Sequence, residues 1–113
     1  MGLDASVMLR GHDYQDNDSF DHIALHHRLG NISTIGWLWQ RVSALLPEDS
    51  LLLTRVLYSG AHCGDQIEPS LVPALKPELE ALDVDTDEFV VRFRQQMAEL
   101  VEAASREGTP IDF

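Results

Sequence analysis

The chain has 113 residues, a length that suits one domain with a single modest core. Its hydrophobic content of 44% and charged content of 24% are those of a folded protein rather than a disordered one. Nineteen Asp and Glu residues oppose eight Lys and Arg residues, which gives a formal net charge of −11. Such a surface repels nucleic-acid phosphates and anionic membranes, so we expect neither as a partner.

Compartment signals are few. The first ten residues lack the basic start, apolar centre and cleavage site of a signal peptide, and no apolar run approaches the ~20 residues that a membrane span needs. Cys63 is the only cysteine, which excludes an internal disulfide. Together these features predict a protein of the reducing cytoplasm.

The first segments of the chain alternate between apolar and polar residues. This alternation predicts a strand over residues 2–10, with one face formed by Leu3, Ala5, Val7 and Leu9. Residues 19–29 are ambiguous, because they alternate like a strand while Ser19 and Gly30 resemble helix caps. The alternation favours a strand slightly.

The next two segments, residues 32–46 and 50–59, show features of helices. An apolar stripe predicts a helix from residue 32 up to Pro47, with buried positions at Ile32, Ile35, Leu38, Trp39, Val42, Leu45 and Leu46. Residues 50–59 fit either a buried strand or a short helix that starts at Ser50 and ends at Gly60. The capping residue Ser50 favours the helix.

A third helix is expected after Pro69, where leucines at positions 71, 75, 79 and 82 form a stripe that Pro77 should bend or split. The clearest helix covers residues 86–107, with Asp85 as the expected N-cap and Gly108 as the end. Its expected buried residues are Phe89, Val90, Phe93, Met97, Leu100, Val101 and Ala104.

The closing stretch PIDF predicts a terminal strand in which Ile111 and Phe113 share a face. The predicted architecture is therefore α+β: one globular domain over residues 1–113, with a few-stranded sheet that includes the N-terminal and C-terminal strands and three to four helices covering it.

Four short stretches carry a resemblance: the opening MGLD, HRLGN ahead of a tryptophan-bearing helix, YSGAHCGDQI, and the ending GTPIDF. They resemble small uncharacterised bacterial proteins, and the opening resembles that of phage-encoded hypothetical proteins beginning with MGLD. Because those proteins have no assigned activity, the resemblance implies nothing about chemistry.

The stretch SGAHCGD concentrates reactive residue types. A nucleophilic Cys63 would need a base, but the side chain of the adjacent His62 should diverge from it, and a base such as His26 or His27 would have to come from elsewhere. A tight turn explains the stretch more simply, with Gly60 and Gly64 at positive φ and the Asp65 side chain bonded to nearby amides. We therefore assign no catalytic residue.

Zinc is the one cofactor for which the sequence offers ligands, namely His22, His26, His62, Cys63 and Asp65. His22 and His26 stand four apart, which would place both on one face of a helix but roughly 13 Å apart on a strand. A small zinc-dependent hydrolase using these residues is the alternative function.

The acidic stretch HDYQDNDSFD invites a calcium hypothesis. Counted from Asp13, the EF-hand pattern requires glycine at its sixth position and glutamate at its twelfth, and these positions hold Asp18 and Ala24. The pattern fails, and a solvated acidic loop is the preferred interpretation.

Trp37 projects from the polar face of the predicted helix, beside Arg41. An exposed tryptophan on such a face often marks an interface, so Trp37 and Arg41 are the candidate protein-binding residues. The competing interpretation is that another segment of the chain, such as residues 19–29, covers the ring. The preferred function is a non-enzymatic cytoplasmic binding or accessory protein, expected to be a homodimer, whose acidic surface masks a basic protein partner such as a toxin.

Overall fold

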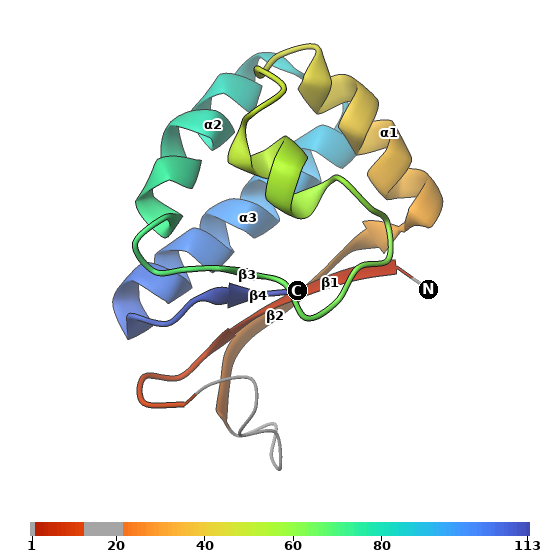
Figure 1. Cartoon of the computed structure of the whole chain (residues 1–113). Coiled ribbons are helices and arrows are strands. Elements are labelled where there is room, and N and C mark those ends of the chain that lie inside the picture. Colours follow the sequence, from red (N-terminus) through yellow and green to blue (C-terminus); the bar gives the residue numbers. More distant parts are fainter. Residues whose placement is uncertain (1, 13–21) are drawn as a thin grey trace.

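The computed structural model describes residues 2–12 and 22–113, which form an α+β domain around a four-stranded antiparallel sheet (Figure 1). The strand order is β2-β1-β4-β3. The strands are β1 Gly2–Met8, β2 Ile23–Asn31, β3 Gln66–Ile67 and β4 Ile111–Asp112. Both terminal segments are strands of the sheet, as predicted, and the structure places them side by side in its middle.

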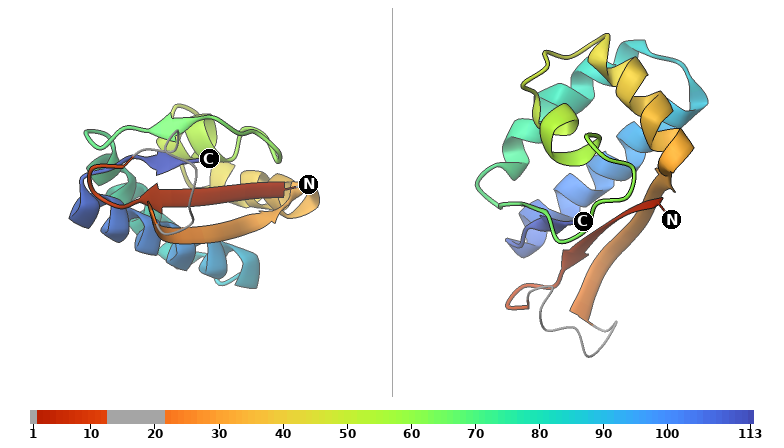
Figure 2. Two further views of the ribbon diagram at one scale, coloured as in Figure 1. Left: turned by 90° about the horizontal axis from the view of Figure 1, so that it is seen from below. Right: turned by 45° about the vertical axis from the view of Figure 1, so that its right-hand side comes forward.

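The helices lie on one face of the sheet (Figure 1), and the described residues place no helix on the other face (Figure 2, left). The α-helices are α1 Ile32–Ser43, α2 Leu75–Ala81 and α3 Glu88–Glu107. Short helical turns are the π-helix η2 Leu52–Val56 and the 3-10 helices η3 Val72–Ala74 and η4 Leu82–Val84. Within the described ranges, no helix has both the length and the apolar character needed to cross a membrane.

Strand β1 confirms the predicted alternation for Leu3, Ala5 and Val7, which are fully buried. The predicted strand is too long, since β1 ends at Met8 and Leu9 lies beyond it, only partly buried. Strand β2 pairs with β1 in antiparallel register, so the strand interpretation of the following segment is confirmed over Ile23–Asn31. The helix interpretation is wrong there, since β1 offers an edge that satisfies the β2 backbone. Residues 19–21 and the acidic loop of the calcium hypothesis lie outside the described residues.

The buried stripe of α1 is narrower than predicted. Ile35, Leu38 and Val42 are buried, as expected. Three residues predicted to be core are instead exposed: Ile32 at 53%, Trp39 at 39% and Leu45 at 36%. The helix ends at Ser43, so Leu45 no longer follows the helical period, while the other two lie at the margin of the stripe.

The helix interpretation of residues 50–59 is confirmed only over Leu52–Val56, which form a π-helix with Leu52, Leu53 and Val56 buried. Its main N-terminal cap comes from elsewhere. The Glu78 carboxylate accepts hydrogen bonds from the amides of Leu51 and Leu52, both at 2.9 Å.

Gly60 does not end this helix, and its φ is not positive. A Cβ at this position would lie 2.9 Å from the Cα of Ile32, so glycine is needed because two backbones approach closely. The predicted positive φ is therefore wrong for Gly60 and correct for Gly64, whose φ is 85°.

The leucine-striped segment after Pro69 is helical but divided into η3, α2 and η4, and neither division falls at Pro77, where the bend or split was predicted. Pro77 lies in the first turn of α2, where its missing amide hydrogen leaves no helical bond unmade. The helix therefore accommodates the proline after the break rather than bending at it.

Helix α3 ends at Gly108, which has φ of 70°, as predicted. The predicted N-cap is wrong by two residues. Asp87, not Asp85, caps the helix, and its carboxylate accepts from the amides of Phe89 at 2.9 Å and Val90 at 3.3 Å. Asp85 instead turns toward α1. Phe89, predicted to be core, is 38% exposed because it stands in the first turn beside this cap.

Candidate functional site

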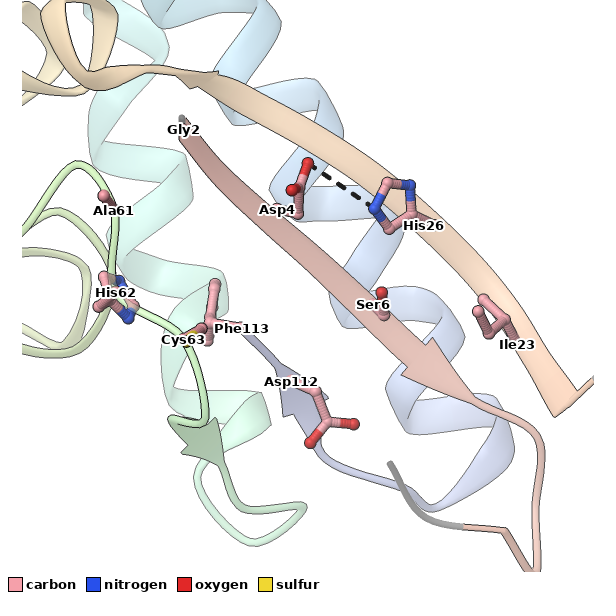
Figure 3. A pocket seen from close by; sticks show the side chains of 10 residues that line it. All are labelled: Gly2, Asp4, Ser6, Ile23, His26, Ala61, His62, Cys63, Asp112 and Phe113. Atoms are coloured by element: carbon pink, nitrogen blue, oxygen red, sulfur yellow. Dashed lines mark ion pairs between the residues drawn. The ribbon is translucent and has the colours of Figure 1, made fainter. Parts of the chain in front are cut away.

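A hollow of about 270 Å³ opens on the sheet face that carries no described helix; we call it the outer-face cavity (Figure 3). Its floor is formed by Asp4 and Ser6 of β1 and Asp112 of β4. His26 of β2 stands on one side, and the turn that holds Cys63 stands on the other. These positions come from four separate segments of the chain.

Strand register produces this arrangement. Leu3, Ala5 and Val7 point into the core, so Asp4 and Ser6 must point outward. Ser6 lies opposite both His26 and Asp112 in the antiparallel ladders. The Asp112 carboxylate accepts a hydrogen bond from the Gln66 side-chain amide at 2.6 Å, which extends this polar row to β3.

The structure does not gather the five candidate zinc ligands at one point. His26, His62 and Cys63 all line the outer-face cavity, but His26 lies on β2, two strand spacings or roughly 10 Å from β4, and the turn is bonded to the end of β4. His22 precedes β2 and stacks on His12, with ring centroids 3.8 Å apart. Within residues 2–12 and 22–113, no three His, Cys, Asp or Glu side chains form a group that could hold a metal ion.

The turn that contains Cys63 is held by a network of three side chains, Tyr58, His62 and Asp65, which we call the turn network. The His62 ring lies 2.7 Å from Asp65 through Nδ1 and 2.8 Å from the Val56 carbonyl through Nε2. The Tyr58 hydroxyl also donates to Asp65, and its ring stacks on His62. Both nitrogens of His62 are therefore committed to oxygens, so His62 is not placed to activate Cys63.

The Asp65 carboxylate is stabilised by this network. The Tyr58 hydroxyl and, after it, the His62 imidazole lower the pKa of Asp65, while the same hydrogen bond raises the pKa of Tyr58. The prediction that the Asp65 side chain would bond nearby amides is wrong. Its backbone carbonyl instead accepts from Phe113 at 2.9 Å, and the Gly64 amide donates to the Phe113 carbonyl at 2.7 Å, which ties the turn to the chain's end.

Trp37 lies where α1 meets the start of α3. The residue is 42% exposed, and its indole nitrogen donates to the Asp87 carboxylate at 3.3 Å. The Arg41 guanidinium lies 5.5 Å from the ring centroid. The Trp37 side chain thus contacts the start of α3, and not the segment 19–29 that the sequence suggested. Much of this residue remains exposed.

Arg41 is held in turn by Asp85, with Nε and Nη2 donating to the two carboxylate oxygens at 3.0 and 2.6 Å. The Asp85 side chain is only 8% exposed. The guanidinium, followed by the Asp87 amide, lowers the pKa of Asp85, and Asp85 raises the pKa of Arg41. A charged, two-pronged pair therefore fixes the cation beside the Trp37 ring.

Two further apolar side chains flank this junction in sequence: Val84, 74% exposed, and Phe89, 38% exposed. We call Trp37, Val84 and Phe89, with the carboxylates of Asp83, Asp87 and Glu88, the Trp37 surface. Sequence reasoning identified Trp37 and Arg41 on α1, but it missed the residues at the start of α3 and just before it. The signal was available in the acidic stretch DVDTDEF, where two apolar residues interrupt a run of carboxylates.

Comparison with known proteins adds no family. No protein-family model matches this chain, and no curated protein or solved structure was found to be similar to it. The functional argument therefore rests on the outer-face cavity, the turn network and the Trp37 surface themselves.

Proposed function

We propose that this chain is a non-enzymatic binding protein of the cytoplasm that docks a basic protein partner on the Trp37 surface. The observation that carries the proposal is that Trp37 is 42% exposed and yet fixed, by Asp87 at its indole nitrogen and by Arg41 at its face. Aromatic side chains that are already ordered lose little entropy on binding, and they dominate the energy of protein interfaces.

Charge supports a basic partner. The exposed Val84 and Phe89 are interspersed with the carboxylates of Asp83, Asp87 and Glu88, and the whole chain carries a formal charge of −11. A cationic protein would be attracted at long range and would find apolar side chains at the point of contact. A second copy of this chain would meet repulsion instead, so we favour a different protein over the homodimer.

The alternative, a zinc-dependent hydrolase, has the ligand types but lacks their convergence among the described residues. Metal analysis of protein purified without a histidine tag separates the two functions. Stoichiometric zinc that is lost on replacing His26 or Cys63 would overturn the non-enzymatic proposal.

The docking site is tested by affinity capture with wild-type protein and two tryptophan variants. Trp37→Ser should lose the captured partner. Trp39→Ser is the matched control, since Trp39 lies on the same helix and is similarly exposed at 39%. The captured protein should be basic, and its Kd should rise steeply with salt.

Two results would contradict the proposal: retention of the same partner by Trp37→Ser, or an affinity that salt does not change. Light scattering on the wild-type chain completes the test. A dimeric mass that Trp37→Ser reduces to a monomeric one would show that the partner is a second copy.

A further inference from the structure

Trp37 already has a cation beside its ring and still has room for a second one. The Arg41 guanidinium lies 5.5 Å from the ring centroid, and no other ring or cation among the described residues stacks on Trp37. With Arg41 in place, Trp37 is 42% exposed. Because the face of an indole ring attracts cations, the exposed part of this ring suits a cationic group from outside the chain.

A carboxylate oxygen beside the indole nitrogen is also available to a partner. The Asp87 carboxylate is held through one oxygen, Oδ1. That oxygen accepts from the Trp37 indole nitrogen at 3.3 Å and from the amides of Phe89 and Val90 at 2.9 and 3.3 Å. The other oxygen, Oδ2, accepts no hydrogen bond from any described residue. Trp37 and Asp87 thus present a ring and an acceptor next to each other.

Arg41 shows which cation suits a pairing of ring and carboxylate. Its guanidinium lies against Trp37 and donates to both oxygens of Asp85, at 3.0 and 2.6 Å. A guanidinium can make both contacts because it is planar, weakly hydrated and carries its donors in its plane. A lysine ammonium is compact and strongly hydrated, so it loses more hydration when it approaches a ring. Asp85 balances the charge of Arg41, so a second cation nearby is not opposed by an unpaired one.

We propose that the basic partner inserts an arginine side chain at the Trp37 surface. Its guanidinium stacks on the exposed part of the Trp37 ring and donates one N–H to Oδ2 of Asp87. This inference rests on the proposed function and specifies the group that the partner supplies. Charge favours it, because Glu88 adds an exposed carboxylate in the first turn of α3 and the chain carries a formal charge of −11.

The test is a titration of the ¹⁵N-labelled full-length protein with three tripeptides, followed by NMR. Each peptide is acetylated and amidated at its ends, and carries arginine, lysine or citrulline, the neutral analogue of arginine, between two glycines. The chain has two tryptophans, so Trp37→Ser identifies which indole signal belongs to Trp37. We expect the arginine peptide to shift this signal to saturation. The lysine peptide should bind about threefold more weakly, and the citrulline peptide about tenfold more weakly.

Two variants decide whether Asp87 or the overall charge attracts the peptide. Asp87→Asn removes the charge but keeps an oxygen that can cap α3, so the fold should be retained. It should weaken the arginine peptide about fivefold. Glu80→Gln is the matched control, since it removes one exposed charge from α2, outside the Trp37 surface, and should leave the affinity unchanged.

Three results would overturn the assignment of an arginine. They are equal affinities for the arginine and lysine peptides, a Trp37 indole signal that does not move, and an Asp87→Asn variant that loses no more affinity than Glu80→Gln. The docking site itself is judged by a different result, which is whether Trp37→Ser retains the captured partner. The two proposals can therefore fail separately.

Discussion

Helix α3 and the π-helix η2 begin and end by different means. Asp87 caps α3 from the position directly before it, and Gly108 ends it from the position directly after. In contrast, η2 is capped at its start by Glu78, more than 25 positions away, and its last carbonyl accepts from His62. The first helix is bounded by its neighbours in sequence, and the second by residues that folding brings to it.

This difference in capping predicts how α3 and η2 should respond when the fold is damaged. A helix with local caps keeps its boundaries when distant parts of the chain are altered, because its orphan amides and carbonyls are satisfied by adjacent residues. A helix with distant caps depends on the whole domain being assembled. We expect η2 and the turn network to be lost first when the sheet is damaged.

The largest effect should come from removing residues 109–113. This deletes β4 from the middle of the sheet and strips two core side chains, Ile111 and Phe113, each contributing about 1.5–3 kcal/mol of burial. It also removes the carbonyl that anchors Gly64. Because a domain of this size has only ~5–15 kcal/mol of stability, we expect no cooperative thermal transition by circular dichroism. An unchanged melting temperature would show that β4 does not hold the sheet.

The next effect concerns the distant cap of η2. Glu78→Ala removes both hydrogen bonds to the η2 amides and should lower the free energy of unfolding by about 2 kcal/mol, measured with urea. The control is Glu80→Ala, an exposed carboxylate of the same helix, which should cost less than about 0.5 kcal/mol. Equal costs for the two variants would mean that Ser50 alone is a sufficient cap.

The local cap of α3 should matter less. Asp87→Ala should cost about 1 kcal/mol, while Asp87→Asn should be nearly neutral, because asparagine also caps helices. Urea unfolding of the two variants measures the difference. If asparagine costs as much as alanine, the negative charge of Asp87 rather than its capping oxygen would be what stabilises the helix.

The smallest expected effect is a change in how the stability of the fold depends on pH. The pKa of Asp65 lies below its ordinary value of 3.8, chiefly because of the Tyr58 hydroxyl. Its carboxylate therefore contributes stability above that value, and the contribution is lost as pH falls through the lowered pKa of the folded state. In Tyr58→Phe, the pKa of Asp65 should rise toward 3.8, and the acid-side loss of stability in that range should become smaller.

NMR titration of the carboxyl carbons measures this shift and contains its own control. The pKa of Asp85 is lowered by Arg41, which lies beside Trp37 and outside the turn network. It should therefore not move in Tyr58→Phe. An Asp65 midpoint that stays in place would show that His62 alone sets its pKa.

Much of the fold could be predicted from sequence because its signals are local. Alternation in β1, the glycine after α3 and the closing PIDF each act through adjacent residues, and all three predictions are confirmed. The errors arose where two local solutions competed. Asp85 and Asp87 could both cap α3, and only the position of Arg41 assigns Asp85 to α1.

The candidate sites were less accessible to sequence reasoning. Trp37 and Arg41 stand on one face of a predicted helix, so their proximity could be inferred from helical spacing. Asp87 joins them only through the packing of α1 on α3. His22 and His26 could have shared a helix face, and β-pairing with β1 removed that possibility.

The sequence by itself determined that this protein is acidic, that it is α+β, and that its two ends form strands, because charge and periodicity are properties of neighbouring residues. Tertiary structure alone decided that Ser6 lies between His26 and Asp112, and that Glu78 caps η2. The physical reason is that register and long-range contacts depend on how the buried faces pack together, and no spacing along the chain records that outcome.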